Sequence, residues 1–467
     1  MRPRSAAAAF VVLVCAIAAH ADAESPVRAE GRAVWTGGVE GGGTGLESGQ
    51  AQETSEGGKA QPAEGVRLEW DDRPSLRAGR WLRIDFRFKS QAEGRRSQED
   101  LTGLGGPFEL GLLRGGVRGE LLGLFEFQIE HDLKSGGKWR DVFLNVRPLV
   151  AAQVRAGKFK VPFSLDKTTG VTDLDLVHRS LAATALAPGR DVGVMVHGSL
   201  LKRSVRYEIG YFRGDGDSPP ALESMPFPLP EDEAPVKQPS QAARIRVAPF
   251  RALSRDTLVE SLEFGVAATS TTTPVGPNHL QGQSVLGVDF FPRRYYVSGP
   301  RRRMGAEFSW TPGPASVKSE YIRSTEARLG QGVGSEAGLD NDLPDLVGRG
   351  WYVMGTWVLT GEKKEGGVVP RKALFQGGVG AIEIAGRYEG LRFASADQAE
   401  APSSSPRATT VEANEDSVVT VGVNWYPNRW VKVQVNAIRE RFADPARSPI
   451  PGQATVVTYV LRVQFVL

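Results

Sequence analysis

Arginines recur four residues apart in segments of this sequence where apolar and polar side chains alternate. Arg83 and Arg87 form one such pair, Arg114 and Arg118 form a second, and Arg155 lies in a third segment. A guanidinium is a planar fork of donors that suits oxyanions. Fixed positive charge at the narrow part of a channel favours anions, because low-dielectric walls focus the field there. These five arginines are therefore candidate anion-contacting residues.

A simpler interpretation of the same arginines is that each one pairs with a carboxylate on a neighbouring segment. Asp85, Glu126, Glu130 and Asp132 are close in sequence and stand in the same alternating pattern. Such pairs would only hold a solvated wall together, and exposed ion pairs contribute little free energy.

Catalytic chemistry has weak support in this sequence. The five histidines are scattered without the spacing of a metal site, and the chain contains no G-x-S-x-G element or P-loop. His197 with Asp191 is the pair that a barrel enzyme would have to use, and a surface adhesin is a further alternative. We expect no enzyme activity, no metal and no cofactor.

Composition excludes two further classes of protein. The 467 residues carry 57 Lys and Arg against 54 Asp and Glu, so the net charge of +3 does not indicate a nucleic-acid-binding surface. A single cysteine cannot form a disulfide within its own chain.

The elements that would position the arginines are short strands with a period of two. In one segment Leu82, Ile84 and Phe86 alternate with Arg83 and Asp85, which gives a strand with one apolar and one charged face. Sixteen such strands are predicted, at 80–91, 107–119, 122–133, 138–147, 149–160, 190–201, 204–213, 241–250, 257–269, 301–311, 315–325, 349–361, 379–392, 417–427, 430–441 and 455–467.

The connections between these strands alternate between long and short, except that 134–138 and 362–378 break the rule. An even number of amphipathic strands, with long loops at one end and short turns at the other, is typical of a bacterial outer-membrane β-barrel. A soluble β-sandwich also alternates, but it has no reason to alternate loop length in this way. Sixteen strands leave room for an aqueous channel. An apolar segment at 285–291 is assigned to a long loop.

The first 65 residues differ in composition from the barrel region. Residues 1–23 have basic residues, an apolar stretch and an Ala-x-Ala site, which predicts a signal peptide. Residues 24–65 are rich in Gly, Glu and Gln and predict a disordered tether. The barrel is expected over 66–467, in the bacterial outer membrane.

Six stretches of the chain resemble the phosphate-selective porin O/P family, and together they run over nearly all of the barrel region. They are RLEWDDRPSLRAGRWLRIDFRFKSQ (67–91), RAGKFKVPFSLDKTTG (155–170), APGRDVGVMVHG (187–198), GPASVKSEYIRS (313–324), GAIEIAGRYEGLRF (380–393) and GVNWYPNRWVKVQVN (422–436). The resemblance implies a homotrimeric sixteen-stranded channel for small anions, with phosphate or polyphosphate preferred, whose third loop folds inward. Its partners would be these anions, outer-membrane lipid and lipopolysaccharide, and no nucleic acid.

The resemblance also implies two further site residues and one departure. The family's lysine corresponds to Lys167, and its arginine twelve residues later corresponds to Arg179. The two serines of the selective members correspond to Gly170 and Val171, which have no hydroxyl, so Thr168 and Thr169 are the candidate replacements. This departure favours, as an alternative, a general diffusion porin with little phosphate selectivity.

Overall fold

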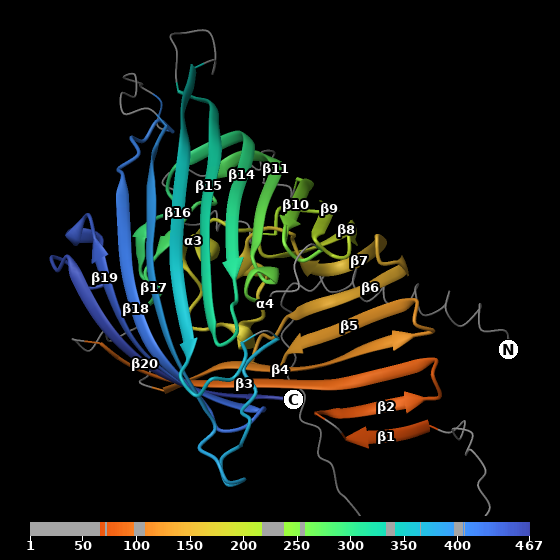
Figure 1. The fold of residues 1–467 in the computed structure, drawn as a ribbon. Coiled ribbons are helices and arrows are strands. Elements are labelled where there is room, and N and C mark those ends of the chain that lie inside the picture. The colour runs from red at the N-terminus through yellow and green to blue at the C-terminus, as the bar shows by residue number, and fades with distance from the viewer. Residues whose placement is uncertain are drawn as a thin grey trace, which may run out of the picture.

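The computed structural model is a closed barrel of sixteen antiparallel strands, shown in Figure 1. The structure describes residues 66–70, 72–97, 108–216, 238–252, 257–332, 341–364, 366–396, 405 and 407–467. The last strand pairs with the first, Val466 lying opposite Lys89 and Thr458 opposite Ser97, so the sheet closes on itself. Closure leaves the barrel wall without a free edge, as a membrane requires. In the described part of the chain, no helix is long and apolar enough to cross a membrane.

Each of the sixteen predicted strands corresponds to one strand of the barrel. The strands are β3 (Leu82–Ser97), β4 (Phe108–Leu121), β5 (Phe125–Asp132), β6 (Trp139–Leu149), β7 (Ala152–Lys160), β8 (Arg190–Leu200), β9 (Val205–Phe212), β10 (Ser240–Val247), β11 (Glu263–Pro277), β14 (Tyr296–Trp310), β15 (Ala315–Gly332), β16 (Asn341–Val358), β17 (Ala381–Ser395), β18 (Asn414–Tyr426), β19 (Val431–Phe442) and β20 (Thr455–Val466). The fold class predicted from the sequence is confirmed.

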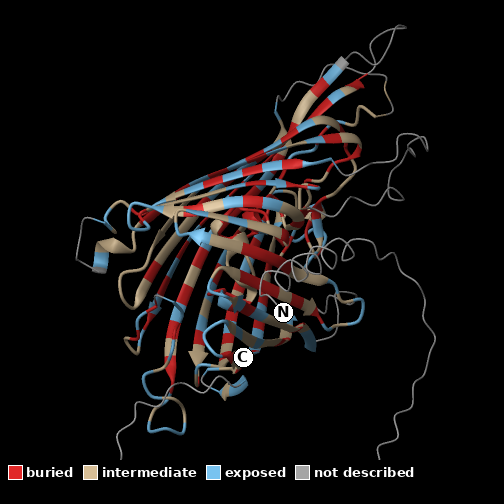
Figure 2. Cartoon of the chain, turned by 90° about the vertical axis from the view of Figure 1, so that its right-hand side faces the viewer, coloured by how far each residue is buried: buried red, intermediate tan, exposed pale blue. Residues whose placement is uncertain are grey.

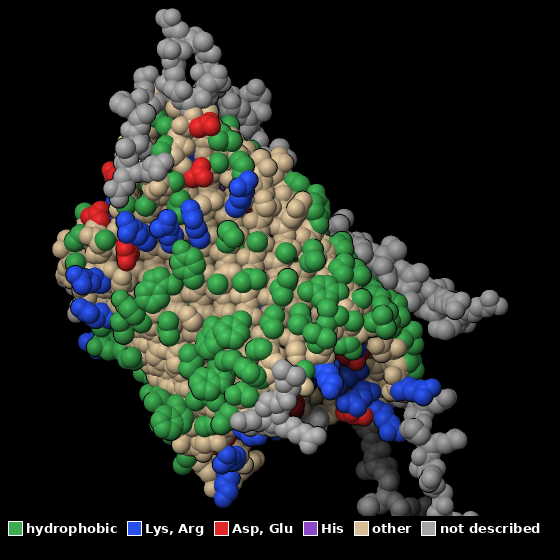
Figure 3. Space-filling model, turned by 45° about the horizontal axis from the view of Figure 1, so that its top comes forward, with side chains coloured by type: hydrophobic (Ala, Val, Ile, Leu, Met, Phe, Trp, Pro, Cys, Tyr) green, Lys and Arg blue, Asp and Glu red, His purple; other side chains and the backbone are tan. Residues whose placement is uncertain are grey.

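Alternating exposure along the strands separates an outer apolar face from an inner polar face. In β18, Val419, Val421 and Val423 are exposed, whereas Thr420 and Asn424 are fully buried. Figure 2 shows the same alternation along the other strands, and Figure 3 shows a broad band of hydrophobic side chains with charged groups toward its two ends. Such a band matches the hydrocarbon layer of a membrane.

Most connections alternate in length as the sequence predicts, both predicted exceptions are present, and the connection from β10 to β11 (248–262) is a third, long at the short-turn end. The turn between β5 and β6 is short at the long-loop end, and the connection from β16 to β17 is long at the short-turn end. Two short strands, β12 (Gly282–Gln283) and β13 (Asp289–Phe291), pair within one long loop, so the 285–291 segment lies outside the barrel wall. Helix α4 (Thr257–Glu260) precedes β11, and the 3-10 helix η4 (Pro445–Arg447) lies between β19 and β20.

An N-terminal hairpin that the strand pattern did not include precedes the barrel. Strand β1 (Val66–Trp70) pairs with β2 (Pro74–Ala78), and β2 pairs with the first residues of β3. The predicted signal peptide and tether, residues 1–65, lie outside the described residues.

The third long loop, residues 161–189, folds into the barrel. It carries helix α2 (Leu165–Thr168), the 3-10 helix η1 (Val171–Asp173) and helix α3 (Leu181–Ala185). Several of its residues are almost completely buried, among them Phe163, Ser180 and Ala182. The loop's backbone is hydrogen-bonded to inward-facing side chains of β15 and β19, so the loop occupies part of the lumen and narrows it, as the family resemblance implied.

Candidate functional site: the luminal cavity at the third loop

The third loop is held against the inner wall by a buried carboxylate. Asp175 accepts hydrogen bonds from Lys318 of β15 at 2.8 Å and from Lys364 of the β16–β17 connection at 2.6 Å. Burial alone raises the pKa of Asp175, but the two ammonium groups outweigh burial and lower that pKa below its ordinary value. Asp175 therefore stays ionised and fixes the middle of the loop to two separate parts of the wall.

Further wall residues bond the loop's backbone along its length. Lys432 donates to the carbonyls of Thr172 and Leu174, at 2.9 Å each. Glu320 accepts from the backbone N–H groups of Leu165 and Asp166 at 2.6 and 2.8 Å. Backbone groups removed from water need such partners, so the wall supplies the hydrogen bonds that an irregular buried segment lacks. The loop is thereby a fixed part of the lumen.

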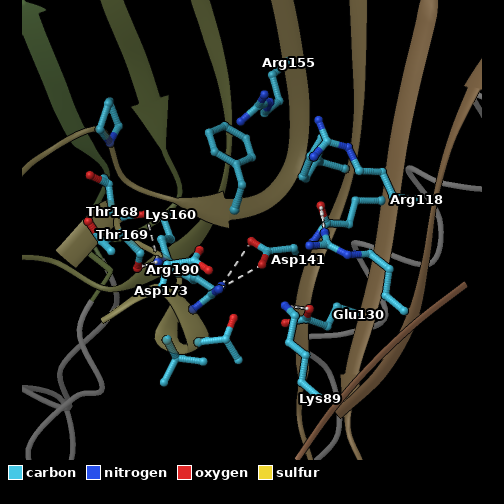
Figure 4. A pocket seen from close by; sticks show the side chains of 18 of the residues that line it. Lys89, Arg118, Glu130, Asp141, Arg155, Lys160, Thr168, Thr169, Asp173 and Arg190 are labelled. Carbon is cyan, nitrogen blue, oxygen red and sulfur yellow. Dashed lines mark hydrogen bonds and ion pairs between the residues drawn. The ribbon is translucent and has the colours of Figure 1, made fainter. Parts of the chain in front are cut away.

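Between the loop and the wall of β3 to β10 lies a cavity of about 760 Å³. Eleven Lys or Arg side chains and five Asp or Glu side chains line it, so cationic side chains outnumber anionic ones in the lining by six. The cations are Arg73, Arg87, Lys89, Arg114, Arg118, Arg155, Lys160, Arg179, Arg190, Arg244 and Arg246, and the carboxylates are Glu126, Glu130, Asp141, Asp173 and Glu208. Figure 4 shows cations of the wall facing Thr168, Thr169 and Asp173 of the loop across this cavity.

Most of the wall cations are paired with carboxylates, as the simpler interpretation of the sequence expected. Arg118 pairs with Glu126, and Arg114 lies 3.6 Å from both Glu130 and Asp132. Three more pairs follow the same pattern: Lys89 with Glu130, Arg190 with Asp141, and Arg244 with Glu307. These cations hold the wall, and their charge is largely compensated.

Arg87 and Arg155 are different, because neither pairs with a carboxylate among the described residues. Arg87 donates to the neutral amide of Gln128 at 3.5 Å. The Arg155 guanidinium lies over the ring of Phe143, 4.4 Å from its centroid, and 5.7 Å from that of Phe159. A ring face attracts the cation without neutralising it. Arg155 therefore keeps both its charge and donor groups available toward the cavity (Figure 4).

Lys160 and Arg179 bond backbone carbonyls at the end of α2. Lys160 donates to the carbonyls of Thr168 and Thr169 at 3.1 and 2.7 Å. Arg179 donates to the carbonyl of Thr169 at 2.7 Å and to that of Asp166. Burial lowers the pKa of Arg179 from its ordinary value, although a guanidinium stays protonated in proteins. Both side chains position the loop, and Arg179 adds its charge to the cavity wall.

The threonine hydroxyls of the loop are used within the loop. The Thr168 hydroxyl donates to the Ser164 carbonyl at 2.6 Å and accepts from Arg244 at 3.1 Å. The Thr169 hydroxyl donates to the Leu165 carbonyl at 2.8 Å. In this arrangement their protons point to carbonyls, so the two side chains offer oxygen lone pairs rather than donors to a solute.

The structure brings seven of the nine predicted site residues to one cavity. Those seven are Arg87, Arg114, Arg118, Arg155, Thr168, Thr169 and Arg179. Lys167 does not line the cavity, and its ammonium donates to the Thr184 carbonyl at 3.4 Å. Arg83 also lies outside the lining and pairs with Asp85 at 2.8 Å. A role in anion binding stays a prediction for all nine residues.

Sequence reasoning missed several cavity cations. Lys89 continues the period-two face of Arg83 and Arg87, and this signal could have identified it. Lys160 is the last residue of β7 and Arg190 is the first residue of β8. At a strand end the period of two does not determine whether a side chain faces the lumen or the lipid. Arg73 belongs to the N-terminal hairpin, which had not been predicted.

His197 and Asp191, the pair named from the sequence, have separate hydrogen-bond partners. His197 shares a hydrogen bond with Asn145 at 2.8 Å, and Asp191 accepts instead from the backbone N–H groups of Val192 and Gly216. Among the described residues, no group of three or more His, Cys, Asp or Glu side chains could hold a metal ion.

Comparison with known proteins gives one family and a set of structural neighbours. The model of the family described as "Phosphate-selective porin O and P" matches residues 83–273 and 291–466. Porin O of Pseudomonas aeruginosa is 27% identical over 142 residues, which is 29% of this chain and 29% of that protein. An anion-selective porin from Comamonas acidovorans superposes with a TM-score of 0.50 at 11% identity, covering 83% of this chain and all of the other. Outer-membrane OmpT of Vibrio cholerae has a TM-score of 0.48 at 13% identity, covering 86% and 100%.

A closed sixteen-stranded barrel with an apolar outer band and an inward-folded third loop defines an outer-membrane porin, a channel of the bacterial outer membrane. The family model matches well over half of the chain. The chain therefore belongs to the phosphate-selective porin O and P family.

Proposed function

We propose that this porin is a passive channel that prefers small anions, with phosphate or polyphosphate among its solutes. The observation that carries the proposal is that eleven cationic and five anionic side chains line the cavity at the third loop, and that Arg87 and Arg155 among these cations pair with no carboxylate of the described residues. Charge of one sign in a narrow aqueous passage concentrates counter-ions and repels co-ions. Arg87 and Arg155 keep their charge available to a solute, because neither forms an ion pair among the described residues.

Two bilayer measurements test this proposal. With the purified channel in a planar bilayer, a tenfold KCl gradient is expected to give a reversal potential of the sign that chloride selectivity produces. Millimolar phosphate is then expected to reduce the chloride current, because phosphate carries more charge and occupies the same cavity. A reversal potential of the sign for potassium selectivity contradicts the proposal.

A general diffusion porin with little phosphate preference is the second candidate. Gly170 and Val171 carry no hydroxyl, and the Thr168 and Thr169 hydroxyls donate to backbone carbonyls. Loop donors for a phosphate oxygen are therefore few, whereas the arginines attract any anion. Chloride selectivity that millimolar phosphate does not block would favour this candidate.

We also propose that the channel assembles as a homotrimer in contact with outer-membrane lipid and lipopolysaccharide, as the family resemblance implies. Sedimentation of the detergent-solubilised protein tests the trimer, with a monomer mass as the contradicting result.

A further inference from the structure

The N-terminal hairpin extends the barrel wall at the short-turn end. Strand β20 pairs with β3 from Lys89 onward, and β2 pairs with β3 over Leu82 to Asp85. The hairpin thus occupies the side of β3 that β20 leaves unpaired, at the bottom of Figure 1. The family model begins at residue 83, so the hairpin lies outside the region matched to the family.

Contacts with another turn fix the hairpin's own turn in place. The Trp430 ring N–H donates to the Asp72 carbonyl at 2.8 Å, and Arg429 forms an ion pair with the Asp72 carboxylate. Both partners belong to the β18–β19 turn, on the opposite side of β20. The Ser75 hydroxyl donates to the Arg73 carbonyl at 3.4 Å. The backbone on either side of Arg73 is therefore held.

Arg73 lies where two cavities of the lumen meet. The second cavity, of about 700 Å³, is lined at the short-turn end by residues 366–369, Arg429, Trp430 and Leu467. Five residues line both cavities: Arg73, Thr169, Thr172, Asp173 and Val466. A solute that crosses from one cavity to the other therefore passes Arg73. Within the described part of the chain, the Arg73 side chain forms no ion pair with a carboxylate.

We propose that Arg73 is a specificity-determining residue, a fixed positive charge that the hairpin adds to the lumen between the third loop and the mouth at the short-turn end. Its ligands would be small inorganic anions in transit. Arg73 is the cation that lines both cavities, so its field acts on anions entering from either one. This inference rests on the proposed anion preference, since it assigns part of that preference to the hairpin.

The test places a chemically switchable charge at this position in the full channel. Arg73→Cys is inserted into planar bilayers and treated with a cationic or an anionic methanethiosulfonate reagent. Arg77→Cys is the matched control, because Arg77 lies on the same hairpin, pairs with Glu69 at 3.0 Å and lines neither cavity. The unsubstituted channel, whose sequence has one cysteine at position 15, controls for reaction elsewhere.

Arg73→Cys is expected to lower the chloride-to-potassium permeability ratio about ninefold, because one unit charge several ångströms away in water favours chloride about threefold and disfavours potassium about threefold. The cationic reagent should restore the ratio, and the anionic reagent should lower it further, in the same folded channel. The Arg77→Cys ratio should not respond. An Arg73→Cys channel that keeps the original ratio before and after both reagents overturns the inference. Potassium selectivity of the unsubstituted channel would instead contradict the proposed anion preference. The direction in which each reagent changes the permeability ratio of Arg73→Cys would still show whether the charge at position 73 acts on passing ions.

Discussion

Replacing Arg155 by methionine is expected to weaken the attraction of the cavity for anions. Methionine is unbranched and can lie against Phe143 and Phe159, so the substitution removes the charge and donors while keeping apolar contact with the rings. Because Arg155 has no carboxylate partner among the described residues, its removal leaves no buried acid unpaired. The barrel should therefore fold and insert as before.

The magnitude follows from the position of the guanidinium at the cavity wall. An anion about 4 Å from a unit charge gains about 1 kcal/mol in water and about 4 kcal/mol at an effective dielectric constant of 20. The cavity, at about 760 Å³, has room for many waters, so the lower figure applies. A loss of about 1 kcal/mol corresponds to about a fivefold weaker attraction.

The assay is the concentration of phosphate that halves the chloride current through single channels. Arg155→Met should raise that concentration about fivefold relative to the unsubstituted channel. Arg83→Met is the control, because Arg83 pairs with Asp85 and does not line the cavity. An equal effect of both substitutions, or no effect of Arg155→Met, refutes the view that unpaired arginines attract the anions.

Three further predictions concern the third loop. Asp175→Asn leaves the ammonium groups of Lys318 and Lys364 without their shared carboxylate. Breaking such a buried pair costs about 3–5 kcal/mol of stability. The substituted channel should therefore unfold at a lower temperature, and its single-channel current noise should rise. Since the folded-state pKa of Asp175 lies below the ordinary value of 3.8, the stability it contributes is present above that ordinary pKa and is lost only as pH falls through the lower folded value. The difference in unfolding temperature between the unsubstituted channel and Asp175→Asn should therefore stay constant down to pH 4, and a difference that shrinks between pH 6 and pH 4 would contradict this. Lys167→Ala should change the phosphate concentration that halves the chloride current less than Arg155→Met does, because Lys167 does not line the cavity. A larger effect of Lys167→Ala would show that Lys167 contacts the anion.

The barrel could be predicted from the sequence because the membrane imposes a period of two on each strand. Strand ends were harder to predict where strands continue beyond the apolar band. Strand β15 runs to Gly332 rather than ending at 325, and β16 begins at Asn341 rather than at 349. Backbone pairing continues there, but the apolar alternation that marks a lipid-facing strand does not. The hairpin was missed although Val66, Leu68 and Trp70 alternate with Arg67 and Glu69.

The site was less predictable, because pairing depends on register and on the path of the third loop. The alternating pattern places Arg118 and Arg155 alike on polar faces, yet Arg118 meets Glu126 across the strands and Arg155 meets Phe143. The phenylalanine faces the lumen at a position opposite Gly157, where β7 has a positive φ of 126° that favours glycine. No sequence spacing reveals which arginine lacks a carboxylate.

Whether fixed positive charge controls the passage of ions can be tested on the unsubstituted channel. The measurement is its chloride-to-potassium permeability ratio, obtained from reversal potentials at low and at high salt. Control by fixed positive charge predicts a ratio above one near 0.1 M KCl that falls toward one near 1 M, as the screening length shortens from about 10 Å to about 3 Å. A ratio at or below one at low salt would contradict it.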